Sequence, residues 1–185
     1  MGNRGILHDE NRHLAVYPNT DRVPWKTKAW ITCSLEFRGR KRQVMSPGRY
    51  TELFFLDEAT AFSAGHRPCA ECRRQAYTQF KTLWIQAHGD LPIDQTLHEE
   101  RTNAKGNKRT HSASAESLPS GTFIVWQGDA WLLWNDCVLK WSSGGYVEKV
   151  ARDVLSGDVE VLTPPSIVAV FVLGYRPHVH VTALE

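Results

Sequence analysis

The sequence FFLDEATAFSAGHRPCAEC, residues 54–72, decides the fold, because it joins an apolar strand to a short helix and then to a Cys-x-x-Cys knuckle. Asp57 is a residue type that caps helix N-termini, and Gly65 can take the left-handed conformation that often ends a helix. Cys69 and Cys72 are spaced so that both sulfur atoms can turn toward one tetrahedral ion. The stretch therefore predicts a zinc site, with Zn²⁺ as the cofactor.

The sequence on either side of this stretch predicts strands before it and helices after it. Residues 29–37 and 50–56 alternate or are apolar enough to form strands. A longer helix should follow the knuckle, because apolar residues recur there at helical spacing: Tyr77, Phe80, Trp84 and Ala87. Gly89 and Pro92 can end this helix. Residues 93–101 predict one further helix.

The last third of the chain has the pattern of a β-rich region. Its apolar segments are rich in Val, Ile, Leu and Trp and are separated by glycine-containing turns. The predicted strands are 122–127, 130–134, 137–141, 146–150, 159–163 and 167–173. We therefore expect an α+β fold, in which a small zinc-stapled α/β module packs on a C-terminal antiparallel β-sheet or partly open barrel.

Three parts of the chain are expected from this pattern. Residues 1–101 form the metal-binding module together with an irregular N-terminal segment. Residues 102–120 are almost all polar and include several basic side chains, so they predict a loop. Residues 121–185 form the β-rich region, which we expect to be one compact unit with the first part.

Cysteine usage and hydropathy indicate the compartment. Four cysteines in 185 residues are too few and too scattered for a secreted disulfide framework. No apolar run approaches the about 18 residues of a membrane span, and no signal-peptide pattern opens the sequence. We expect a cytoplasmic protein with no membrane partner, in which a thiol is either a small buried apolar group, as predicted for Cys137, or a metal ligand.

The charge is unevenly distributed. The net charge is only +2, but residues 1–120 hold 18 Lys and Arg against 13 Asp and Glu, whereas residues 121–185 hold 4 against 7. A polyanion would therefore be attracted to the first part of the chain. The predicted partner is a nucleic acid or another phosphate-containing ligand.

The order of strand, capped helix, Gly-x-Arg-Pro-Cys-x-x-Cys and second helix resembles the Ada-type metal-binding module of alkyl-DNA repair proteins. The resemblance covers about twenty residues, and the positions that match within them are Phe54, Phe55, Glu58, Ala59, Gly65, Arg67, Pro68, Cys69 and Cys72. The resemblance implies a four-thiolate zinc site with two upstream cysteines separated by three residues. Cys33 is present upstream, but Phe37 stands four places after it. We therefore do not predict for this chain the methyl transfer from DNA that the Ada-type module performs.

The remaining metal ligands are predicted from nearby residues. Cys33, on the strand before the module, is the best third ligand for the ion of Cys69 and Cys72, and His66 is the further candidate. His178 and His180 share one face if their segment is a strand, so they form an alternative pair.

Candidate catalytic residues come from two places. Asp94, His98 and Arg101 are spaced to share one helix face, where a carboxylate can orient an imidazole and a guanidinium can hold a phosphate. His8 follows a glycine-containing segment that permits close approach to a ligand. The catalytic hypothesis is that Asp94, His98 and His8 take part in hydrolysis of a nucleic acid; a solvated helix and a flexible N-terminus give the same pattern.

Arginines near the knuckle give nucleic-acid binding its electrostatic basis, because the guanidinium group makes bidentate contacts with phosphate. The predicted nucleic-acid-binding residues are Arg4, Arg38, Arg40, Arg42, Arg67, Arg73, Arg74 and Arg101.

Together these observations predict a zinc-containing nucleic-acid-binding protein, with repair or hydrolytic processing of DNA or RNA as its catalytic hypothesis. One alternative is a zinc-dependent nucleobase or nucleoside deaminase, because Pro68-Cys69-x-x-Cys72 matches the second half of that signature. The other alternative is a structural zinc module that binds proteins and has no catalytic role.

Overall fold

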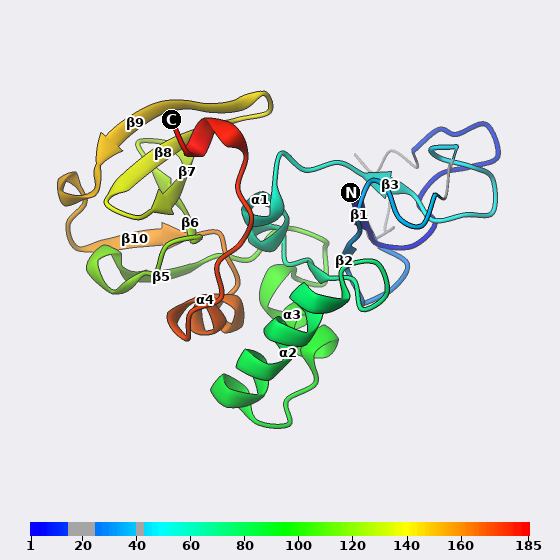
Figure 1. Cartoon of the computed structure of the whole chain (residues 1–185), viewed down its shortest axis with the longest axis horizontal. Coiled ribbons are helices and arrows are strands. Elements are labelled where there is room, and N and C mark those ends of the chain that lie inside the picture. The colour runs from blue at the N-terminus through cyan, green and yellow to red at the C-terminus, as the bar shows by residue number, and fades with distance from the viewer. Residues whose placement is uncertain (15–24, 40–42) are drawn as a thin grey trace.

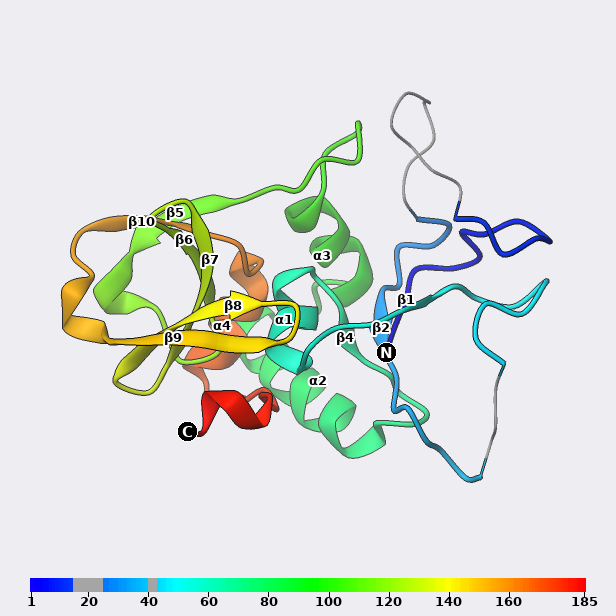
Figure 2. The ribbon, with the colours of Figure 1, turned by 90° about the horizontal axis from the view of Figure 1, so that it is seen from above.

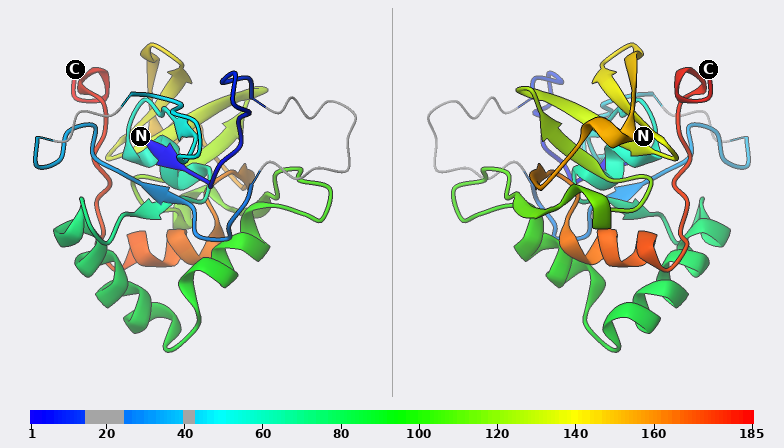
Figure 3. Two further views of the ribbon diagram at one scale, coloured as in Figure 1. Left: turned by 90° about the vertical axis from the view of Figure 1, so that its right-hand side faces the viewer. Right: turned by 90° about the vertical axis from the view of Figure 1, so that its left-hand side faces the viewer.

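The computed structural model of the 185-residue chain describes residues 1–14, 25–39 and 43–185. A large sheet lies at one end of the molecule and a small sheet at the other, and the helices α2, α3 and α4 gather on one side of both (Figures 1 and 3). None of the helices in the described parts has the length and apolar character of a membrane span.

The large sheet is antiparallel and has six strands in the order β5-β10-β6-β7-β8-β9. The strands are β5 (His111–Ser114), β6 (Phe123–Trp126), β7 (Asp129–Trp134), β8 (Cys137–Ser142), β9 (Gly145–Ala151) and β10 (Asp158–Val161). Gln127 and Gly128 both have positive φ, which suits the tight hairpin between β6 and β7. The predicted α+β fold is confirmed, and the sheet is open rather than a closed barrel.

Two segments differ from the expected secondary structure. Residues 167–172 of the predicted strand 167–173 belong to the helix α4 (Pro165–Val172), whose first residue is a proline. Proline suits a helix start, because its missing N–H would have no partner there and its φ is already helical. Residues 102–120, predicted as a loop, contain the edge strand β5, which pairs along its whole length with β10.

The small sheet has four strands in the order β3-β1-β2-β4, each two residues long. They are β1 (Gly2–Asn3), β2 (Ile31–Thr32), β3 (Glu52–Leu53) and β4 (Arg67–Pro68). The predicted strands 29–37 and 50–56 are therefore much shorter than expected. β2 and β4 run parallel, so the residues after them, which include two cysteines, leave the sheet at the same edge.

Three helices lie along the chain between β3 and β5. They are α1 (Glu58–Ser63), α2 (Arg74–His88) and α3 (Ile93–Arg101). Asp57 caps α1 as predicted, because its carboxylate accepts a hydrogen bond of 2.8 Å from the backbone N–H of Thr60. α1 lies between the large sheet and the small one (Figure 2). Three 3-10 helices complete the described elements: η1 (Ala115–Ser117), η2 (Arg152–Val154) and η3 (Val181–Ala183).

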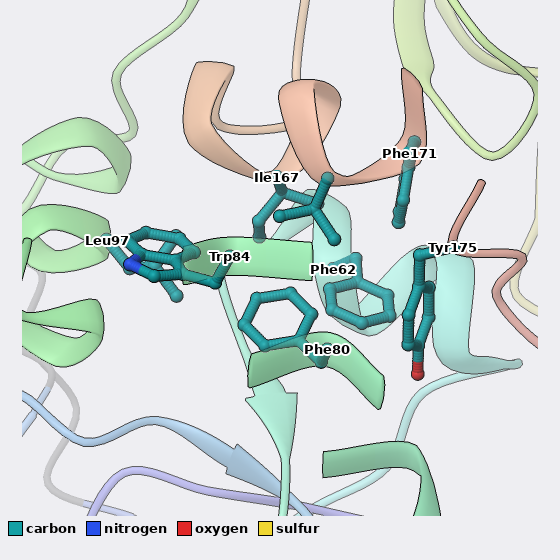
Figure 4. Close-up of a cluster of buried hydrophobic side chains, with 8 residues drawn as sticks. Phe62, Phe80, Trp84, Leu97, Ile167, Phe171 and Tyr175 are labelled. Carbon is teal, nitrogen blue, oxygen red and sulfur yellow. The ribbon is translucent and has the colours of Figure 1, made fainter. Parts of the chain in front are cut away.

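An aromatic core joins these helices. The cluster contains Phe62 of α1, Phe80 and Trp84 of α2, Leu97 of α3, Ile167, Val170 and Phe171 of α4, and Tyr175 (Figure 4). Phe80 and Trp84 lie on the stripe predicted for α2, and at most 1% of either residue is exposed. Burial of apolar side chains from four helices holds the segment that carries the knuckle against the rest of the molecule.

Two acidic residues at the start of α1 hold the C-terminal segment. The buried Glu58 carboxylate accepts hydrogen bonds from the Tyr175 hydroxyl and the His178 backbone N–H. The Asp57 carboxylate accepts from the Tyr146 hydroxyl of β9 and the His180 backbone N–H. This small helix therefore connects the knuckle, the large sheet and the chain end.

Candidate metal centre

Cys33, Cys69 and Cys72 come from two separate parts of the sequence and meet beside the small sheet. Thr32 of β2 stands opposite Pro68 of β4, so Cys33 and Cys69 are the next residues on neighbouring parallel strands. The Cys69 backbone N–H donates to the Thr32 carbonyl over 2.9 Å. Cys72 follows in the turn that leads into α2. The strand pairing therefore brings the third predicted cysteine to the knuckle.

The three sulfur atoms are close enough to share one ion. All three Sγ atoms lie within 4.8 Å of one another. In a tetrahedral zinc site with Zn–S bonds of about 2.3 Å, the sulfur atoms are about 3.8 Å apart. A small inward adjustment of the side chains would satisfy this geometry. The arrangement can therefore hold a metal ion, and its thiol donors suit zinc.

Backbone N–H groups point at two of the sulfur atoms. The N–H of Ser34 donates to Cys72 Sγ over 3.3 Å, and the N–H of Glu71 donates to Cys69 Sγ over 3.4 Å. A hydrogen bond to sulfur stabilises the thiolate, which is the form that binds metal. The turn thus places dipoles where negative charge would develop.

The thiols differ in their ease of ionisation. Burial raises the pKa of Cys33, and the neighbouring sulfur atoms of Cys69 and Cys72 raise it further. Burial also raises the pKa of Cys69, but hydrogen bonds from the backbone N–H groups of Cys72 and Glu71, together with those from the Cys72 and Cys33 thiols, lower it, so that its pKa is lowered overall. Three adjacent thiolates repel one another, so full ionisation needs a cation among them.

A cavity of about 110 Å³ opens beside the cluster and is lined by all three cysteines. Its other walls include Asn3, Ile31, Leu35, Phe37, Tyr50 and Glu71. Within the described residues, no fourth Cys, His, Asp or Glu side chain joins the group of ligand atoms. Cys33, Cys69 and Cys72 would therefore hold a metal beside a cavity in which a further ligand could be accommodated.

The other predicted ligands lie elsewhere. His66 is completely buried, and its ring lies against Trp30 and Phe55, with centroid distances of 5.2 and 4.8 Å. His178 and His180 lie in the C-terminal segment, where their backbone N–H groups bind Glu58 and Asp57. Among the residues that the structure describes, the metal-ligand group contains none of these histidines.

The predicted catalytic residues do not share one centre. Both carboxylate oxygens of Asp94 accept hydrogen bonds of 2.7 Å from Arg67. His98 contacts Arg101 over 3.3 Å. His8 lies at a different place, where its Nδ1 is 2.7 Å from the Thr51 hydroxyl. The helix spacing does bring His98 and Arg101 together, whereas Asp94 is occupied by Arg67.

The predicted nucleic-acid-binding arginines have different partners. Arg67 is paired with Asp94, and Arg73 forms an ion pair of 2.7 Å with Glu58. Arg74 is exposed at the start of α2. Arg38 is also exposed and lies over the Phe37 ring. Arg40 and Arg42 lie outside the described residues.

Arg4 and Arg101 contact the same aromatic ring. Each guanidinium carbon is 3.8 Å from the centroid of the Trp30 ring. From the sequence, Trp30 was predicted only as part of a strand, without this contact. The hydrogen bond from Lys108 to the carbonyl of Ser63 was not predicted either. The sequence shows a tryptophan and scattered basic residues, but their spacing does not indicate that the segments of Arg4, Trp30 and Arg101 meet in the fold.

No protein-family model matches this chain, and no curated protein or solved structure is significantly similar to it. The fold and the cysteine cluster by themselves define an α+β protein with a three-cysteine centre able to hold a metal ion.

Proposed function

We propose that this chain is a zinc-containing nucleic-acid-binding protein, in which the metal holds the small sheet in place and the adjacent basic surface contacts phosphates. The observation that carries the proposal is the convergence of the Cys33, Cys69 and Cys72 sulfur atoms within 4.8 Å. Zinc bound there would join β2 and β4 to the start of α2. The resemblance of the knuckle to the Ada-type module supports a nucleic acid as the partner.

Charge supports the same partner. The excess of basic residues lies in residues 1–120, the part of the chain that contains the three cysteines of the metal centre. Phosphate contacts by Lys and Arg supply most of the nonspecific affinity for nucleic acids. Arg67 and Arg73 are engaged in ion pairs, and only 2% of Arg101 is exposed. The proposal therefore relies chiefly on Arg4, Arg38 and Arg74.

The deaminase alternative requires a glutamate that can move a proton beside the metal. Glu58 lines a second cavity, of about 230 Å³, together with Cys33. Its carboxylate already binds Arg73, the Tyr175 hydroxyl and a backbone N–H. A carboxylate whose oxygens are already engaged by three partners is not free to approach a metal-bound substrate, so we favour the binding function over this chemistry.

The proposal is tested by fluorescence anisotropy with labelled single-stranded DNA, single-stranded RNA and duplex DNA. Because about three phosphate contacts are available, affinity should fall about 20-fold to 40-fold between 50 and 200 mM salt. Arg4→Gln should weaken binding, whereas the exposed Arg176→Gln, in the acidic part of the chain, should not. Absence of binding, or an affinity that salt does not change, would contradict the proposed function.

A further inference from the structure

The three clustered cysteines can be reached by a small oxidant. Cys33 and Cys72 are partly exposed, whereas only 8% of Cys69 is exposed. The cavity of about 110 Å³ that all three line has room for several water molecules. Hydrogen peroxide, which has two oxygen atoms, therefore fits beside the sulfur atoms and meets Cys72 more readily than the buried Cys69.

Cys69 and Cys72 lie in one turn that suits a disulfide bond. The backbone N–H of Arg73 donates to the Cys69 carbonyl over 3.1 Å and closes this turn. Cα atoms three residues apart in a turn lie within about 7 Å, and a disulfide usually joins Cα atoms about 4.4 to 6.8 Å apart. The two Sγ atoms are already within 4.8 Å of each other. The bond can therefore form with little movement of the backbone.

Cys33 is a less suitable partner for either thiol. Cys33 and Cys69 are the next residues on neighbouring parallel strands, which lie about 4.8 Å apart, whereas the Cβ atoms of a disulfide are about 3.8 Å apart. A bond between them would pull the two strands together. A bond between Cys33 and Cys72 would close a much longer loop, which costs more chain entropy than closing the turn of Cys69 and Cys72.

We propose that Cys69 and Cys72 form a peroxide-sensitive pair whose disulfide prevents the cluster from holding its metal. Hydrogen peroxide first converts the Cys72 thiol to a sulfenic acid and releases one water molecule. The Cys69 thiol then attacks the Cys72 sulfur, so that the S–S bond forms and the hydroxyl group leaves as a second water molecule. Each sulfur loses one electron, and the peroxide gains both.

The disulfide leaves Cys33 as the only thiol of the three. A structural zinc site has four ligands, and its cysteines bind as thiolates, so one remaining thiol is too few. The oxidised chain would lose the metal and the connection between β2, β4 and the start of α2. The inference deepens the proposed function, on which it rests for its effect on nucleic-acid binding, by adding a means of regulation.

The test treats the zinc-loaded full chain with hydrogen peroxide, alkylates the thiols that remain and digests the product with trypsin. Trypsin cleaves after Arg49 and Arg73, and the bond before Pro68 resists it. Both thiols of the pair therefore lie in one peptide, residues 50–73, and Cys33 lies in another, residues 29–38.

Mass spectrometry should find peptide 50–73 without alkylation and lighter by its two thiol hydrogens, while Cys33 and Cys137 are alkylated. A colour-forming chelator should detect about one zinc ion released for each disulfide formed. Dithiothreitol with added zinc should reverse both changes. Cys137→Ser, which removes a thiol on β8 of the other sheet, should respond to peroxide as the wild-type chain does.

The Cys33→Ser variant keeps the test valid even if it holds no metal, because its peptide 50–73 should still form the disulfide. Absence of this disulfide, a disulfide that includes Cys33, or zinc retained after the disulfide has formed would overturn the inference. Labelled oligonucleotides should lose affinity for the oxidised chain. If they bind neither form while the disulfide forms and zinc is released, the proposed function fails and the peroxide-sensitive pair stands.

Discussion

Single residues determine how closely segments approach one another in the part of the molecule that contains the three clustered cysteines. Gly65 has φ of +75°, and a Cβ atom there would lie 2.5 Å from Cδ of Arg101. Gly2 is similar, since its Cβ would lie 2.4 Å from the Phe55 ring and 3.3 Å from His66 Nε2. The absence of side chains at these two positions therefore allows Arg101 and His66 to pack beside the small sheet.

His66 should make the stability of the protein depend on pH. Burial, and then the charges of Arg4 and Arg101, hold the pKa of His66 well below 6.5. Below about pH 6.5 the unfolded chain gains a proton here that the folded chain does not, so the free energy of unfolding should fall by up to about 1.4 kcal/mol per pH unit. Urea unfolding from pH 8 to pH 5 measures this dependence.

Comparing how steeply the stability of each variant falls with pH separates the contribution of His66 from that of other titrating groups. His66→Gln should be less stable at every pH but should lose stability less steeply below pH 6.5. The control His13→Gln, whose side chain is 78% exposed, should keep the wild-type slope. Equal slopes for His66→Gln and the wild-type chain would show that this imidazole is protonated in the folded state.

At this scale the sequence predicted the residues whose roles are local. The cap at Asp57 and the pair Cys69 and Cys72 depend on spacings within a few residues, which the sequence displays directly. Trp30 could not be assigned its role, because Arg4 and Arg101 reach it from segments far away in sequence. Only the folded chain brings such side chains together.

Among the elements, α1 is short but is linked by hydrogen bonds to several other parts of the molecule. It has six residues, too few to be stable alone, and its first turn is held by the Asp57 cap. The same carboxylate accepts hydrogen bonds from the Tyr146 hydroxyl and the His180 backbone N–H. Its loss would therefore affect the helix, the large sheet and the C-terminal segment together.

Asp57→Ala should destabilise the protein by about 2 kcal/mol or more, because it removes a helix cap and leaves a partly buried hydroxyl without its acceptor. Denaturant unfolding measures the loss. The control Asp136→Ala, at an exposed turn between β7 and β8, should change the free energy of unfolding by less than about 0.5 kcal/mol. Equal effects of the two substitutions would contradict the role given to Asp57.

The periodicity of the elements was informative where one face is buried and misleading elsewhere. α2 shows a clear stripe, so its existence and its buried residues Phe80 and Trp84 were predicted. α4 is apolar on most sides and rich in Val and Ile, and such a run cannot be distinguished from a buried strand by period. The prolines at its start were the signal that favoured a helix.

The two ends of the molecule differ in how much packing and hydrogen bonding stabilises them. The large sheet has six strands and its own buried clusters, whereas the four strands of the small sheet are two residues long. Strands this short bury little apolar surface and form few hydrogen bonds. A metal ion bound by Cys33, Cys69 and Cys72 would join the small sheet to α2 and supply part of the missing stability.

The α+β class and the open antiparallel sheet were predictable, because hairpin turns and apolar runs are local features of the last third of the chain. The sequence predicted Cys33 only as the best candidate for the third metal ligand beside Cys69 and Cys72. The physical basis of their convergence, the parallel pairing of β2 with β4, is a long-range contact that no local pattern displays.

The metal content of the purified chain, measured by mass spectrometry together with protein concentration, tests the central claim most directly. We expect about one zinc ion per chain, with loss of the metal in Cys33→Ser and in Cys72→Ser and full retention in Cys137→Ser, since Cys137 lies on β8 of the other sheet. A wild-type chain without bound metal, or Cys33→Ser and Cys72→Ser variants that keep the metal content of the wild-type chain, would contradict the account.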